Sequence, residues 1–253
     1  MKVVIACRHG QAYKNLKNIY GGKGSGLTDD GIAQVEGLSE ELLELVKYLQ
    51  LPVHIYRSCD RIHVKESSEI LREKLGLEEV ETDPQFKPIR LGVFDGMSRE
   101  KQLELYPEAC EAHQKWEKGL IDITESECLV EGAQPALDYY EQLKGFISSL
   151  PEKGIYILLG TRSDAACLYN LFQDKSPANY MQYQYYDFGY AEAKVLLERG
   201  NEHQMLDIKE VADRIEQAKN ASQTGQAETT EAVNVPSQSD DEGEVDSDDD
   251  IDI

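Results

Sequence analysis

The stretch Val3-Val4-Ile5-Ala6-Cys7-Arg8-His9-Gly10-Gln11 decides the fold of this chain. Its apolar run of small and β-branched residues predicts a buried strand that ends at Gly10. Because open α/β sheets bind ligands at the carboxyl ends of their strands, Arg8 and His9 are expected at a binding edge. An arginine there suits a phosphate, and an imidazole can act as a nucleophile. On these two residues alone, an Arg-His pair that merely caps a strand is an equal alternative.

The rest of the folded part alternates strand-like and helix-like segments. Short apolar runs predict further strands at 53–56, 155–159 and 193–198. Apolar residues at helical spacing predict helices near 28–49, 64–75, 134–150, 164–172 and 206–218, with a polar helix around 98–118 interrupted near Pro107. This rhythm predicts an α/β three-layer sandwich, with a mainly parallel central sheet and helices on both faces.

The composition changes near residue 219. Residues 221–253 hold 11 Asp or Glu and no Lys or Arg, which is half of the net charge of −22. Such a segment cannot bury enough apolar area to offset its ordering entropy. We therefore expect a folded domain at 1–218 and a disordered acidic tail at 219–253. The tail either only solubilises the protein or docks onto a basic protein partner.

Composition also excludes several classes of function. The first 220 residues carry 37 acidic and 26 basic residues, which argues against a nucleic-acid partner. No apolar run is long enough to span a membrane. The five cysteines are scattered without a CxxC pair, which favours reduced thiols and a cytoplasmic protein. No pattern of metal ligands is present, so neither a metal nor a cofactor is expected.

Several short motifs together resemble the histidine phosphatase superfamily, whose fold is that of phosphoglycerate mutase. They are Arg8-His9-Gly10, Asn15, Leu27-Thr28 with Gly31 and Gln34, Gly92 with Gly96, and the strand and helix at 155–172. The resemblance covers nearly all of residues 1–200. It implies that His9 attacks a phosphoryl group to form a phosphohistidine, with Arg8 stabilising the charge and Asn15 contacting the phosphate.

Three positions depart from the pattern that the resemblance implies. His63 stands where the family places its second arginine, and Arg61 lies two residues earlier. Pro88 stands where the family places the acid that protonates the leaving oxygen. Thr161 holds the place of the second catalytic histidine, with Arg162 beside it. Losing a general acid typically costs about 10²–10⁴ in rate, and losing an electrostatic stabiliser costs about 10²–10³.

These departures leave two hypotheses open. In the first, the protein is a pseudophosphatase whose pocket around Arg8 and His9 binds a phosphorylated small molecule or a phosphoprotein with little or no turnover. In the second, it is an active phosphomonoesterase that works through phospho-His9, with Asp95 as a replacement acid and with Arg61 or His63, together with Arg162, as the rearranged cationic groups. A third, separate hypothesis is a protein-interaction module carried by the tail. The candidate catalytic residues are Arg8, His9 and Arg61, with His63 as the aligned substitute, and the candidate substrate-binding residues are Asn15 and Arg162.

Overall fold

The structure is a computed structural model that describes residues 1–118, 120, 130–173, 187–199, 202–211, 213, 214 and 217. Residues Met1–Glu216 form one compact unit. The predicted tail at 219–253 lies outside the described residues, so its disorder and the boundary at 218 stay predictions. Within the described part of the chain, no helix is both long and apolar enough to cross a bilayer.

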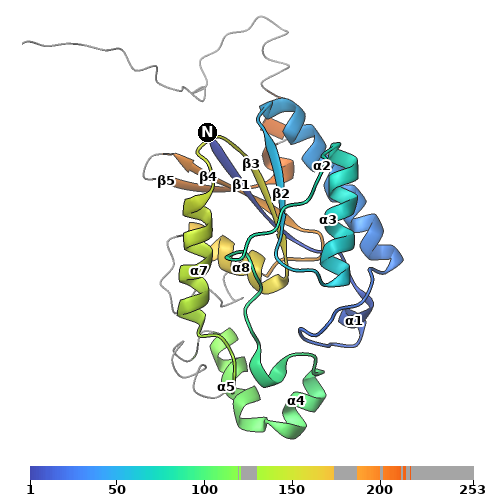
Figure 1. The fold of residues 1–253 in the computed structure, drawn as a ribbon, viewed down its shortest axis with the longest axis vertical. Helices are drawn as coiled ribbons and strands as arrows, with labels where there is room; N and C mark the ends of the chain where they lie inside the picture. The colour runs from blue at the N-terminus through green and yellow to red at the C-terminus, as the bar shows by residue number, and fades with distance from the viewer. Residues whose placement is uncertain are drawn as a thin grey trace, which may run out of the picture. The chain divides into compact units, whose positions relative to one another are not determined.

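A five-stranded mixed sheet forms the middle of this unit, in the order β2-β3-β1-β4-β5 (Figure 1). Strands β1 (Lys2–Arg8), β3 (Gly154–Gly160) and β2 (Val53–Arg57) run parallel. Strand β4 (Ala193–Arg199) is antiparallel to β1, and β5 (Glu202–Asp207) is antiparallel to β4. The predicted α/β class and the buried strand at residues 3–7 are confirmed.

Helices cover both faces of the sheet, as the sandwich prediction requires. Helices α2 (Asp29–Leu49) and α3 (Ile62–Leu75) pack on one face, and α7 (Ala136–Ser149) and α8 (Arg162–Phe172) pack on the other (Figure 1). Alternate residues of β1 point to opposite faces of the sheet. Val3 and Ile5 therefore pack in the core under α2 and α3, and Val4 packs in the core under α7 and α8. Both faces are therefore buried, which explains the continuous apolar run in β1.

The sequence prediction was wrong at the end of the domain. The helix predicted from residue 206 begins only at 208, because residues 202–207 form β5. This strand is mainly polar and lies at the sheet edge, where it pairs with β4 from Lys194 to Arg199. Its backbone hydrogen bonds come from a partner strand, so the segment itself carries little local strand signal.

The smaller elements lie around the carboxyl ends of the parallel strands. Helix α1 (Tyr13–Leu16) follows β1, and a 3₁₀ turn, η1 (Gly92–Phe94), follows a long connection from α3. Helices α4 (Arg99–Leu105) and α5 (Pro107–Glu117) come next. Pro107 begins α5, where its missing N–H costs nothing, and this accounts for the predicted interruption.

Two glycines bring the end of β1 against the start of α2. A Cβ at Gly10 would lie 2.4 Å from the Gly31 carbonyl oxygen, and one at Gly31 would lie 2.0 Å from the Gln11 oxygen. Hydrogen bonds fix this contact, because Gln11 N donates to the Gln34 side chain at 3.0 Å and Thr28 Oγ1 caps Gly31 N at 2.9 Å. The glycines are thus needed for close backbone approach, and the approach fixes the loop that carries His9.

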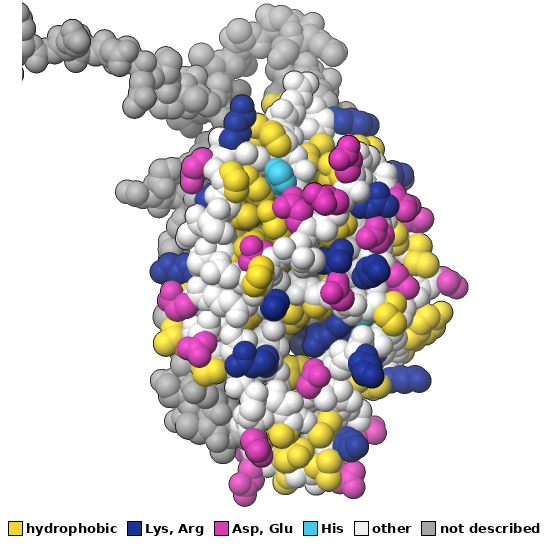
Figure 2. All heavy atoms as spheres, viewed as in Figure 1, with side chains coloured by type: hydrophobic (Ala, Val, Ile, Leu, Met, Phe, Trp, Pro, Cys, Tyr) yellow, Lys and Arg dark blue, Asp and Glu magenta, His cyan; other side chains and the backbone are white. Residues whose placement is uncertain are grey.

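The face drawn in Figure 2 shows Lys and Arg side chains interspersed with Asp and Glu. A separate group of cationic residues, Arg8, Lys14, Arg61 and Arg162, lines a cavity at the end of β1.

Candidate functional site

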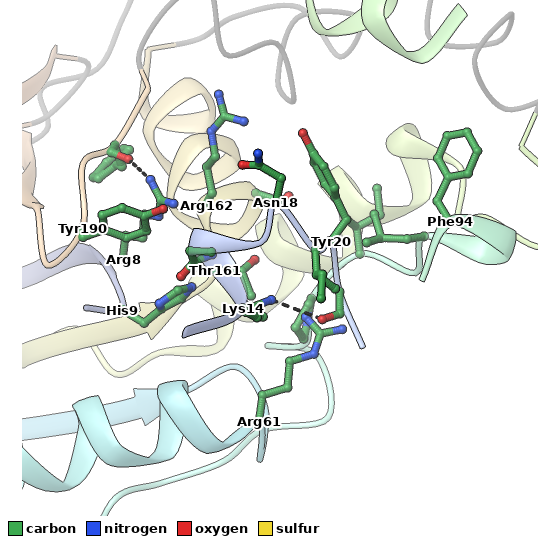
Figure 3. Close-up of a pocket in the computed structure, with 18 of the residues that line it drawn as sticks. Arg8, His9, Lys14, Asn18, Tyr20, Arg61, Phe94, Thr161, Arg162 and Tyr190 are labelled. Atoms are coloured by element: carbon green, nitrogen blue, oxygen red, sulfur yellow. Dashed lines mark hydrogen bonds between the residues drawn. The ribbon is translucent and has the colours of Figure 1, made fainter. Parts of the chain in front are cut away.

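A cavity of about 450 Å³ opens at the carboxyl ends of β1 and β3. This is within the range of pockets that hold small organic ligands. The end of β1, helix α1, the starts of α3 and α8, and the segments 88–94 and 187–190 all contribute to its wall. The structure brings five of the six predicted site residues to this wall, namely Arg8, His9, Asn15, Arg61 and Arg162. Figure 3 labels all of these except Asn15.

His9 is buried at the cavity, with 3% of its surface exposed. Its Nδ1 lies 2.6 Å from the Gly10 carbonyl oxygen, and because a carbonyl can only accept, Nδ1 carries the proton. Burial and the nearby His63 hold the pKa of His9 well below its usual value of 6.5. The imidazole is therefore neutral at physiological pH, and the lone pair of Nε2 is available to a phosphorus atom.

Arg8 is held by residues from the far end of the chain. Its Nη1 donates to the Phe188 carbonyl at 2.5 Å, and its guanidinium carbon lies 4.0 Å from the centre of the Tyr190 ring. The centroids of the Tyr190 and His9 rings are 6.3 Å apart. The sequence predicted Arg8 at the end of the strand, but it could not identify these partners, because they are more than 170 residues away.

His63 lies directly beside His9, yet it does not line the cavity. The two rings are edge-on with centroids 4.3 Å apart, and His63 is fully buried. The backbone of Ser25 is the polar group that interacts with its ring, and this contact raises the pKa of His63 only in part. Burial, Lys14 and Arg61 lower the pKa of His63 to about 3. His63 is therefore uncharged, and it supplies no fixed positive charge to the site.

Two other cations line the cavity near that position. Arg61 is the N-cap residue of α3, and its Nη2 lies 3.5 Å from Asp95 Oδ1. Lys14 Nζ donates to the Gly21 carbonyl at 3.2 Å, and burial together with Arg61 lowers the pKa of Lys14 to about 8. Figure 3 shows Lys14 between His9 and Arg61. Sequence reasoning missed Lys14, whose only signal was its place one residue before Asn15.

Asn15 also lines the cavity, but its oxygen is already used. Its Oδ1 accepts the Ala12 N–H at 2.9 Å and thereby caps α1. The amide nitrogen is thus the part of this side chain that can donate to a phosphate.

Thr161, where the resemblance implies a second histidine, lies at the start of a helix. Thr161 is the N-cap residue of α8, and its backbone N–H donates to Asp164 Oδ2 at 2.7 Å. Asp164 is completely buried and also accepts a hydrogen bond from the Tyr139 hydroxyl. Asp164 is therefore committed to the helix terminus.

In the described segments, the acidic side chains at or beside the cavity wall already have partners. Asp95 is not among the lining residues; it accepts the Gly22 N–H at 2.8 Å and pairs with Arg61. Among the described lining residues the one carboxylate is Asp187, whose two oxygens accept from Arg162 at 2.5 and 2.7 Å. Pro88 itself lines the cavity, so this part of the wall offers an apolar ring instead of a carboxyl group.

Solved structures of phosphatases share the fold. Mycobacterial glucosyl-3-phosphoglycerate phosphatase matches with a TM-score of 0.63 and 19% identity over 82% of this chain and 98% of that one. Alpha-ribazole phosphatase from Shigella flexneri matches with a TM-score of 0.62 and 12% identity, over 81% of this chain and 95% of that one. A phosphoserine phosphatase variant from Entamoeba histolytica was solved in complex with phosphoserine. It matches with a TM-score of 0.59 and 17% identity, over 82% of this chain and 96% of that one. No curated protein matches the chain.

The sequence also matches the profile of the histidine phosphatase superfamily (branch 1) over residues 4–144, which is more than half of the chain. That stretch includes the Arg8-His9-Gly10 motif and the α2 start that holds it in place. The family expected from the motifs is thus confirmed, and this chain belongs to the histidine phosphatase superfamily.

Proposed function

We propose that this protein binds a phosphate monoester in the cavity around Arg8 and His9 and hydrolyses it weakly or not at all. One observation carries the proposal. Among the described lining residues there are four cationic side chains, Arg8, Lys14, Arg61 and Arg162, while the one carboxylate, Asp187, is bound to Arg162. Such a cavity attracts a phosphate, and the part of its lining that the structure describes offers no free carboxyl group to protonate the leaving oxygen.

The roles proposed for the residues follow from this geometry. Arg8 and Arg61 bind the phosphate oxygens, Asn15 donates from its amide nitrogen, and His9 faces the phosphorus with Nε2. Arg162 contributes positive charge at the start of α8, although its guanidinium is shared with Asp187. Without an acid at Pro88, departure of an alkoxide is slower by about 10²–10⁴.

An active phosphomonoesterase is the second candidate, and a specific observation favours it. The Nδ1 contact with Gly10 fixes His9 as a neutral nucleophile, which is the state that phosphoryl attack requires. Lys14, with its pKa of about 8, is protonated at neutral pH and can give up its proton more easily than an ordinary lysine. In this alternative Lys14 replaces the acid, a role for which Asp95 is poorly placed.

The structural neighbours support a phosphorylated small molecule as the ligand. Their names state that they act on glucosyl-3-phosphoglycerate, alpha-ribazole phosphate and phosphoserine. A phosphoprotein remains the alternative ligand. The cytoplasmic location, and a basic protein partner for the acidic residues 219–253, belong to the same proposal and rest on composition alone.

The decisive experiment combines binding and turnover. Calorimetry with inorganic phosphate tests the pocket, and phosphate release from p-nitrophenyl phosphate and sugar phosphates tests catalysis, in the wild type and in His9→Ala. His54→Ala is the matched control, because His54 lies on β2 outside the cavity. We expect phosphate binding with little release of phosphate. Rapid release that disappears only in His9→Ala would instead establish the active enzyme.

A further inference from the structure

The cavity is much larger than a phosphate, and its wall changes character along its length. Near β1 it carries Arg8, His9 and Lys14. Two other segments add apolar side chains to the wall, Ile19 and Tyr20 after α1, and Ile89, Leu91 and Phe94 around η1, and polar side chains of Asn18, Gln102 and His113 also line the cavity. Figure 3 shows Arg8 and Tyr190 on one side of the view and Tyr20 and Phe94 on the other, with Lys14 and Arg61 between them.

The apolar wall is held in place by backbone hydrogen bonds. Tyr20 N donates to the Met97 carbonyl at 3.0 Å, and Gly96 N donates to the Tyr20 carbonyl at 2.7 Å. Behind the wall, Phe94 and Leu91 pack in a small core with Cys110. The apolar surface therefore exists before a ligand arrives, so ordering it costs a ligand little free energy.

From these two ends we infer that the ligand is an aryl phosphate, with its phosphate at Arg8 and His9 and its ring against Tyr20, Leu91 and Phe94. The inference rests on the proposed function, because it places the phosphate in the same pocket. Phe94 is already buried, but an aromatic ring would cover the half-buried Tyr20 and Leu91, whereas a glycerate or sugar phosphate would place polar groups against them.

The chemistry of the site favours the same class of ligand. Phenols ionise near pH 10, whereas aliphatic hydroxyl groups are far weaker acids, so a phenoxide needs less help from a proton donor. In the step itself, His9 Nε2 forms a bond to phosphorus while the bond from phosphorus to the aryl oxygen breaks, and its electron pair leaves on the phenoxide. Water then attacks the phosphohistidine, which releases inorganic phosphate and a proton and restores neutral His9.

Four ligands test separately whether the ring contributes to binding and whether a phenolic leaving group speeds phosphate release. Phenyl phosphate and benzyl phosphate both carry a ring, but only phenyl phosphate has a phenolic leaving group. Inorganic phosphate and 3-phosphoglycerate lack the ring. We expect both ring compounds to bind about tenfold or more tightly than the other two. We also expect phosphate release from phenyl phosphate to exceed release from benzyl phosphate by about 10²-fold or more.

Two leucine variants test the wall itself. Leu91→Ala removes a half-buried lining side chain, and Leu103→Ala removes an exposed leucine of α4 that does not line the cavity. We expect Leu91→Ala to weaken benzyl phosphate binding about fivefold or more while inorganic phosphate binds as before, and Leu103→Ala to change neither. Unchanged inorganic phosphate binding also shows that the variant has folded.

The outcomes that overturn the inference differ from those that overturn the proposed function. Equal affinity for phenyl phosphate and 3-phosphoglycerate would show that the apolar wall does not contact the ligand. Equal phosphate release from phenyl phosphate and benzyl phosphate would show that the acidity of the leaving group does not favour an aryl phosphate. Failure of inorganic phosphate and of all three esters to bind would overturn the phosphate pocket itself.

Discussion

The two sides of the cavity differ in the side chains that they offer to a phosphate ester. The side formed by the end of β1 retains Arg8, His9 and Asn15, and the glycine contact with α2 holds them in place. The side formed by residues 88 and 161 carries a proline and a threonine that caps α8. In the proposed function, phosphate binding and departure of the leaving oxygen would depend on separate segments, so one could change without disturbing the other.

Restoring an acid on the altered side is the most severe test of this comparison. Because Pro88 lines the cavity, Pro88→Glu would place a carboxyl group where the leaving oxygen departs. We expect phosphate release from benzyl phosphate to rise by about 10²–10⁴. Lys87→Glu adds the same acid at an exposed neighbour outside the lining and should change nothing. If neither variant gains activity although both bind phosphate, then the acid is not what limits catalysis.

The intact side depends on close backbone contact, which Gly10→Ala would disturb. The new methyl group would lie 2.4 Å from the Gly31 carbonyl oxygen, and a backbone atom cannot move aside cheaply. We expect a loss of about 3 kcal/mol in the free energy of unfolding, measured by urea denaturation. Gly37→Ala is the control, since nothing lies within 4 Å of a Cβ there and alanine favours a helix. A fully stable Gly10→Ala protein would contradict the account of the motif.

The buried His63 should make the fold sensitive to acid. Its pKa is lowered to about 3 in the folded state, whereas in the unfolded chain it takes up a proton near pH 6.5. Between these values the unfolded state binds more protons, so stability falls as the pH falls, by up to about 1.4 kcal/mol per pH unit. Stability measured from pH 7 to 4 should decline less steeply in His63→Phe. Identical slopes would show that His63 does not titrate as its surroundings imply.

The smallest predicted effect concerns Lys14. Its pKa of about 8 means that it is charged below this pH and neutral above it. Affinity for benzyl phosphate, a dianion above about pH 6, should therefore fall as the pH rises from 7 to 9. We expect Lys14→Gln to weaken binding about tenfold at pH 7 and to remove this pH dependence. Lys17→Gln changes an exposed lysine nearby and should behave like the wild type; a pH profile that is the same in Lys14→Gln would exclude Lys14 from the phosphate site.

The sequence was most informative where the structure is local. The apolar run of β1, the Thr28 cap of α2 and the glycine that ends α3 each depend on residues a few positions apart. It failed for β5, because an edge strand with a polar sequence is defined by the strand beside it. Its pattern of helices and strands nevertheless predicted the sandwich correctly.

The candidate site divides in the same way. The sequence by itself determined that Arg8 and His9 stand together at the end of a buried strand, since strand, glycine and neighbouring residues are all contiguous. Only the tertiary structure decided that Phe188 and Tyr190 hold Arg8, and that Lys14 and Arg61 carry the charge that a neutral His63 does not. The physical reason is that burial and charge interactions depend on which distant segments come into contact, and a local pattern of residues does not specify those contacts.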